Sequence, residues 1–160
     1  VNQSFERAYI TQGICRFLCA VEEVEETLKK KKIITNLKSV KEACLLLATA
    51  VEGTYEKSFM NISKAGTSAN KNDTYRWILR ALREGMKIGN EGIEAKKIAQ
   101  KIRDMSGAFN TASIYPCLKN MVSKQDIKIF RYEEQRLFVD DSMFLFFLKW
   151  SDLVKEELNQ

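Results

Sequence analysis

The chain has 160 residues, enough for one good core or two small packed units, and its 45% hydrophobic and 29% charged residues are typical of a soluble globular protein. It contains no histidine, which removes the commonest general base, and its apolar runs are too short to span a bilayer. The net charge of +5 favours a polyanionic partner only weakly, because acidic residues cancel part of it locally. We therefore expect a protein that binds rather than catalyses, with no membrane partner.

Two long helices are predicted in the first part of the chain. The first begins near Ser4 and continues to about Lys31, where acidic and basic residues at i and i+4 support it. Gly13 is a candidate bend. The second helix covers residues 39–60, with apolar residues three or four apart and Gly53 as a candidate kink. We interpret residues 1–60 as a helical subdomain.

Residues 61–72 are polar and rich in residues that favour turns. We predict that this segment is a linker, and that residues 73–160 form a second domain.

The second domain begins with three shorter predicted helices. The first is capped by Asp73 or Thr74 and ends at Gly85, and the second covers residues 94–105. The third starts at Thr111 or Ser113 and has Pro116 in its first turn.

The chain then changes to an apolar period of two. This period predicts strands at 127–132 and 137–139, joined by a turn at 133–135. A final helix is predicted from Ser142 towards Leu158. Because apolar residues cover more than one of its sides, we expect it to dock between the two halves of the chain.

Three helices followed by a hairpin are typical of a winged helix-turn-helix. The predicted fold class is thus mainly α (α+β). It comprises an N-terminal helical subdomain followed by a winged helix-turn-helix with a two-stranded wing and a C-terminal helix.

Candidate nucleic-acid contacts follow from this fold, because the third helix of a DNA-binding winged helix enters the major groove. The candidates are outward residues of that helix and basic residues on its neighbours, namely Arg76, Arg80, Arg83, Lys96, Lys97, Lys101, Asn110, Thr111, Ser113, Tyr115, Lys119, Asn120, Arg131 and Arg136. Two features oppose base reading: the third helix has no arginine, and the wing tip carries Glu133 and Glu134.

The arginines at 76, 80 and 83 follow one helical stripe. They could neutralise phosphates, form a solvated face or pair with an acidic surface of a parent protein. The sequence leaves these alternatives open.

No cofactor, metal or catalytic site is expected. The four cysteines, Cys15, Cys19, Cys44 and Cys117, include only one loose pair, whereas a four-cysteine zinc site needs two close pairs. We interpret them as small core residues in a reducing cytoplasm. The glycines at 85, 89 and 92 do not form a phosphate-binding loop.

Several stretches resemble the C-terminal region of archaeal AAA+/STAND-type ATPases, in which a helical lid and a winged helix follow a P-loop domain. The similarity lies in Tyr75–Gly85, in Lys96–Ile102 around Ala99, in Ser113–Met121 and in Phe138–Phe144. Residues Ala8–Ile14 are similar to the start of the lid, although the family's glycine-proline pattern is missing. The resemblance implies a non-catalytic region, since the family's phosphate-binding lysine and magnesium carboxylate have no matching positions here.

Three hypotheses follow. The first is a DNA-binding or regulatory winged-helix region of such an ATPase, and the second is a protein-interaction module that packs on an NTPase domain or a partner protein. The third is a free-standing transcription regulator that dimerises through its N-terminal helices. Because Val1 lies almost inside a helical pattern, we also expect that the chain is a fragment.

Overall fold

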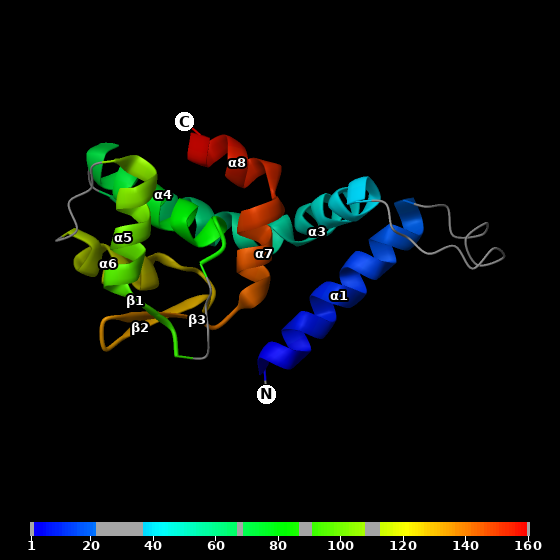
Figure 1. Ribbon diagram of the computed structural model, residues 1–160, viewed down its shortest axis with the longest axis horizontal. Helices are drawn as coiled ribbons and strands as arrows, with labels where there is room; N and C mark the ends of the chain where they lie inside the picture. The colour runs from blue at the N-terminus through cyan, green and yellow to red at the C-terminus, as the bar shows by residue number, and fades with distance from the viewer. Residues whose placement is uncertain (1, 22–36, 67–68, 87–90, 108–112, 160) are drawn as a thin grey trace.

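The computed structural model describes residues 2–21, 37–66, 69–86, 91–107 and 113–159 (Figure 1). These residues form helices α1 (Asn2–Val21), α3 (Leu37–Ser63), α4 (Ala69–Arg83), α5 (Ala95–Ser106), α6 (Ile114–Lys124), α7 (Ser142–Trp150) and α8 (Asp152–Asn159). They also form strands β1 (Ile93–Glu94), β2 (Phe130–Glu133) and β3 (Arg136–Val139). The mainly helical class predicted from the sequence is confirmed.

The predicted hairpin is present as β2 and β3, with Phe130 opposite Val139 and Glu133 opposite Arg136. Its turn is tighter than predicted, because Glu133 belongs to β2. Glu134 and Gln135 make the turn with φ angles of 48° and 59°. Positive φ at both central residues matches the right-handed twist of a two-residue hairpin.

A third strand was not predicted. β1 pairs with β3, so that the antiparallel sheet has the order β1-β3-β2. Two residues are too few to show an alternating pattern, so apolar periodicity cannot predict this strand. Gly92 precedes it with φ 68°, and a Cβ there would lie 3.0 Å from the carbonyl oxygen of Leu137. Glycine at this position thus permits the close approach of the backbone before β1 to β3.

The hydrophobic core surrounds α7, which contacts α1, α3 and α4. The ring of Phe144 lies edge-on to Phe130, with centroids 5.4 Å apart, and 5.6 Å from Tyr55. Phe147 contacts Tyr55 and Phe59 of α3. The predicted docking of this apolar helix between the two halves is confirmed, and the buried aromatic rings supply much of the apolar burial.

The predicted linker at 61–72 is wrong in its secondary structure. α3 continues to Ser63 and α4 already begins at Ala69, while 67–68 lie outside the described residues. Ile62 is fully buried in the core that the second half forms. The polar residues that suggested a loop include Asn61, which lies on the exposed side of the helix. Composition alone cannot distinguish such a helix from a loop.

Two other helix boundaries differ from the prediction. The final helix breaks at Ser151, whose backbone is extended and whose hydroxyl accepts a hydrogen bond from Val154 N–H at 3.4 Å. Asp141 rather than Ser142 caps α7, because its Oδ1 accepts the Met143 N–H at 3.0 Å. The predicted extension of the first helix to Lys31 lies outside the described residues.

Gly13 and Gly53 both lie inside continuous helices, so neither ends its element. At Gly13 a Cβ would lie 2.9 Å from the side chain of Leu47. The glycine therefore lets α1 pack closely against α3.

The cysteines are only partly core residues. Cys44 is buried, and burial raises the pKa of its thiol. Cys117 is half-buried, but Cys15 is exposed, which contradicts its interpretation as a core residue. Within the described ranges, no three or more cysteine or carboxylate side chains gather where a metal ion could be held. No helix in those ranges has both the length and the apolar character needed to cross a membrane.

Candidate nucleic-acid interface

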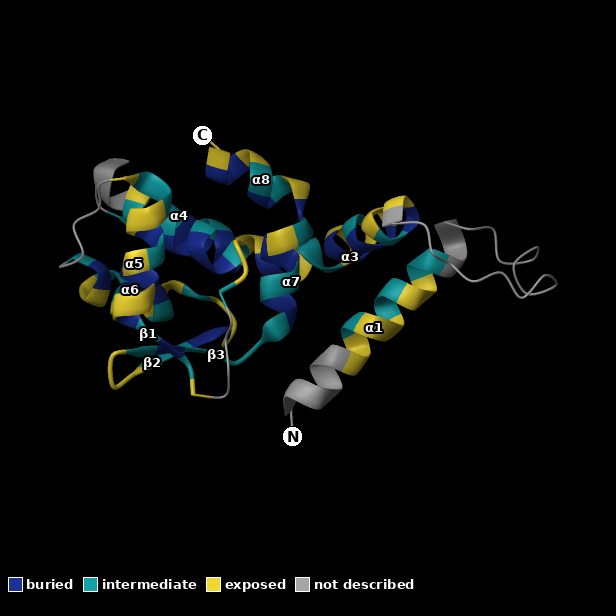
Figure 2. Ribbon diagram, in the orientation of Figure 1, coloured by how far each residue is buried: buried dark blue, intermediate teal, exposed yellow. Residues whose placement is uncertain are grey.

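Helix α6 is fixed by its buried residues Ile114, Leu118 and Met121. Its other side is exposed to solvent at Tyr115, Pro116, Lys119, Ser123 and Lys124 (Figure 2). None of the residues of α6 is acidic. A negatively charged ligand is therefore not repelled by any side chain of this helix.

Asn120, a predicted nucleic-acid contact, makes hydrogen bonds within the protein. Its Nδ2 donates a hydrogen bond to the Tyr75 hydroxyl at 2.6 Å, and Ser123 Oγ donates to its backbone carbonyl at 2.7 Å. Tyr75 is buried, and this burial raises the pKa of its hydroxyl, although the bond from Asn120 lowers that pKa. Asn120 thus anchors α6 to α4.

The start of α6 is only partly described. Ser113 occupies the N-cap position and is half-buried. Asn110 and Thr111, which are also predicted contacts, lie outside the described residues.

The start of α5 carries a cluster of cations around one carboxylate. Glu94 lies 3.0 Å from Lys96 Nζ, 3.5 Å from Lys97 Nζ and 3.4 Å from Arg136 Nη2. Its hydrogen bond with Lys96 is the main cause that lowers the pKa of Glu94. One carboxylate offsets only one of the three positive charges, so the cluster keeps an excess of positive charge.

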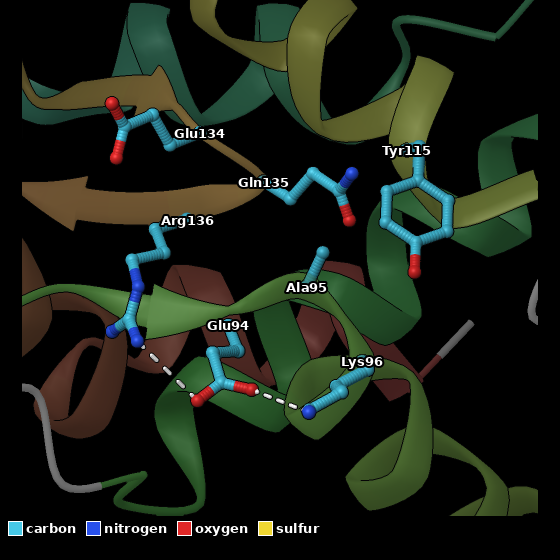
Figure 3. Close-up of a pocket in the computed structure, with 7 residues that line it drawn as sticks. All are labelled: Glu94, Ala95, Lys96, Tyr115, Glu134, Gln135 and Arg136. Carbon is cyan, nitrogen blue, oxygen red and sulfur yellow. Dashed lines mark hydrogen bonds and ion pairs between the residues drawn. The ribbon is translucent and has the colours of Figure 1, made fainter.

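A pocket of about 350 Å³ lies between the starts of α5 and α6 and the hairpin turn (Figure 3). Its lining comprises Glu94, Ala95, Lys96, Tyr115, Glu134, Gln135 and Arg136. The Gln135 side chain points towards Tyr115, whereas the Glu134 carboxylate points away. The carbonyl of Gln135 accepts the Ala95 N–H at 2.8 Å and fixes the turn to α5. Three predicted contacts, Lys96, Tyr115 and Arg136, therefore meet here.

We define the lysine surface as the exposed lysines of α5 and α6, which are Lys96, Lys97, Lys119 and Lys124. Lys101, another predicted contact, is half-buried on α5. Lys124 is not among the residues predicted from the sequence. It could have been predicted as a contact, because it lies in the last turn of a predicted helix without acidic residues.

The arginine stripe, defined as Arg76, Arg80 and Arg83 of α4, is less exposed than the lysine surface. Arg76 Nη2 donates to Glu157 Oε1 of α8 at 3.0 Å, and the two side chains are only 20% and 11% exposed. Arg80 and Arg83 are half-buried. The guanidinium of Arg80 lies 4.6 Å from the centroid of the Trp77 ring. Burial lowers the pKa of Arg80, and its two arginine neighbours lower it further.

Both arginines of the hairpin are also paired. Arg131 Nε donates to both oxygens of Asp140 at 2.9 and 2.8 Å, and Nη1 donates to Glu133 at 3.0 Å. The hydrogen bond to Asp140 is the main cause that raises the pKa of Arg131. Arg136 Nη1 donates to the carbonyl of Glu91 at 2.9 Å. The exposed Glu133 and Glu134 leave the hairpin tip acidic.

Comparisons of this chain with protein families, with curated proteins and with solved structures find no match. The resemblance to archaeal ATPases therefore stays a sequence-based hypothesis.

Proposed function

We propose that this chain is a non-catalytic winged-helix module that binds duplex DNA through the lysine surface. The observation that carries the proposal is the outward side of α6, where Tyr115, Lys119 and Lys124 are exposed on a helix without acidic residues. Lys96 and Lys97 extend the positive charge at the start of α5. The sheet order β1-β3-β2, with α5 and α6 between β1 and β2 in the chain, supports the winged-helix assignment.

The proposed binding is dominated by phosphate contacts. Lysine neutralises phosphates as a point charge, whereas the planar guanidinium of arginine has the fixed fork geometry that suits bidentate contacts with guanine. No arginine lies on α6, and Asn120 is held by Tyr75. Four lysine–phosphate contacts predict a slope of log K against log salt of roughly −3 to −4.

The parent protein and its location belong to the same proposal. The resemblance supports a C-terminal regulatory region of an archaeal-type ATPase in the cytoplasm. The P-loop domain that hydrolyses ATP would then lie outside this chain.

The test is fluorescence anisotropy with a labelled duplex of mixed sequence at low and moderate salt. We expect Lys96→Glu/Lys119→Glu to abolish binding. The control Lys41→Glu/Lys149→Glu makes the same charge change at exposed positions of α3 and α7 and should retain most of the affinity. Equal losses in both variants would show that net charge, and not this surface, governs binding.

A second candidate is a protein-interaction module that packs on an NTPase domain or a partner protein. The acidic hairpin tip favours it, because Glu133 and Glu134 would repel phosphates. Absence of duplex binding even at low salt would exclude the first proposal and favour this one. Light scattering tests the third hypothesis, since a dimeric regulator requires a mass twice that of the chain.

A further inference from the structure

The arginine stripe already binds one carboxylate. Glu157 of α8 reaches across to Arg76 and pairs with it at 3.0 Å in a largely buried setting. This contact shows which ligand chemistry suits the stripe: a carboxylate held by a guanidinium.

The rest of the stripe has no such ligand. Arg80 and Arg83 have no ion-pair partner among the described residues. Both are half-buried, and the negative charge of Asp73 offsets only part of the repulsion that Arg76 and Arg83 exert on Arg80. An incoming carboxylate would relieve this repulsion.

Trp77 prepares one of the two arginines for binding. It is half-buried against the core, and the Arg80 guanidinium lies over its ring. Stacking on an aromatic ring restricts the long arginine side chain before a ligand arrives. Less conformational entropy is then lost on binding.

Acidic residues before and after the arginine stripe limit how far its positive charge extends along the chain. Asp73 lies on α4 three residues before Arg76, Glu84 follows the last residue of α4, and both are exposed. A duplex carries about one negative charge per 1.7 Å and would meet these carboxylates. A segment with only two carboxylates can contact Arg80 and Arg83 while it brings fewer negative charges near Asp73 and Glu84 than a duplex does.

We propose that Arg80 and Arg83 form a docking site for an acidic segment of a partner protein, which presents two carboxylates about one helical turn apart. The site is separate from the lysine surface and goes beyond the proposed DNA-binding function.

The test uses a fluorescein-labelled, alanine-rich peptide with glutamates at i and i+4, and the matching peptide with glutamines. We expect the glutamate peptide alone to bind the full chain. Arg80→Gln/Arg83→Gln should weaken this binding about tenfold, because both carboxylates of the peptide lose their guanidinium partners. Arg80→Lys/Arg83→Lys keeps the charge but removes the bidentate fork, so it should weaken binding less.

Lys119→Gln/Lys124→Gln is the matched control, because it removes the same charge from α6. It should retain peptide binding and lose duplex affinity, whereas the arginine variants should do the opposite. Thermal unfolding verifies that each variant is folded. Equal binding of the glutamine peptide would overturn the proposal. So would loss of duplex binding in Arg80→Gln/Arg83→Gln together with competition between duplex and peptide, which would assign the stripe to nucleic acid.

Discussion

The two basic surfaces of this protein differ in burial and in partners. The arginine stripe of α4 is half-buried, with Arg76 paired to Glu157 and Arg80 lying over Trp77. The lysine surface of α5 and α6 is exposed, and within the described ranges the carboxylate that pairs with Lys96 and Lys97 is that of Glu94. Duplex binding gains free energy by releasing counterions from phosphates, which requires charges that are free to contact them. Net charge alone therefore does not identify the interface.

The chemistry of the two side chains agrees with this division. A guanidinium is weakly hydrated and suits partly buried, bidentate pairs, whereas an ammonium is a strongly hydrated point charge. We therefore expect the arginine stripe to contribute to stability as well as to the proposed docking of an acidic segment. The lysine surface should affect recognition alone.

The largest loss of stability is expected when the ion pair between Arg76 and Glu157 is broken. Glu157→Ala leaves the largely buried guanidinium of Arg76 without its carboxylate partner. The Nε atom of Arg76 already has no hydrogen-bond partner among the described residues. Removing one partner of a buried pair costs about 3–5 kcal/mol, and the partial exposure of Arg76 reduces our expectation to about 2 kcal/mol. Urea unfolding measures this loss. The comparison is Glu94→Ala, which removes the partner of Lys96 and Lys97. This variant should lose clearly less free energy of unfolding, and equal losses would contradict the difference between the two surfaces.

A smaller loss of stability is expected when Asn120 of α6 is replaced, and its neighbour Lys119 provides the comparison. Asn120→Ala should reduce the free energy of unfolding by about 1–2 kcal/mol, because the buried Tyr75 hydroxyl loses its donor. Lys119→Ala should change it by no more than about 0.5 kcal/mol, since this side chain is exposed. If Asn120 instead reads bases, its alanine variant would keep its stability and lose sequence preference. Denaturation of the two variants in parallel decides between these roles.

The dependence of stability on pH gives the next effect. Burial raises the folded pKa of Tyr75 above its ordinary value of 10.0. This contribution to stability is complete below pH 10 and is lost as the pH rises through the folded pKa. Tyr75→Phe should show a shallower loss of stability in alkaline solution than the unmodified chain. Burial also raises the pKa of Tyr132, so Tyr132→Phe serves as a second probe. Parallel profiles for the unmodified chain and Tyr75→Phe would show that Tyr75 does not contribute.

Local periodicity predicted the longer elements well, since helices and the hairpin each show their own apolar repeat. It failed for β1, which is two residues long, and for the polar segment at 61–63, which lies in α3. The exposed Lys96, Lys97 and Lys119 could be predicted because a solvated position needs no distant partner.

The engaged residues could not be predicted in this way. Asn120 is bonded to Tyr75, 45 residues away, and Arg76 to Glu157, 81 residues away. Such pairs depend on how α4, α6 and α8 pack together, which no local pattern encodes. An outward position on a helix is therefore only a necessary condition for a contact residue.

The smallest effect on stability is expected for Lys96→Gln/Lys97→Gln. The two lysine side chains are 75% and 66% exposed, and Glu94 keeps Arg136 as a partner when both are replaced. Exposed ion pairs of this kind contribute little, so the thermal midpoint should not change measurably. The salt slope of duplex binding should nevertheless fall by roughly 2, because two phosphate contacts are lost. A lower midpoint with an unchanged slope would mean that the cluster around Glu94 holds β1 and α5 together and does not contact the duplex.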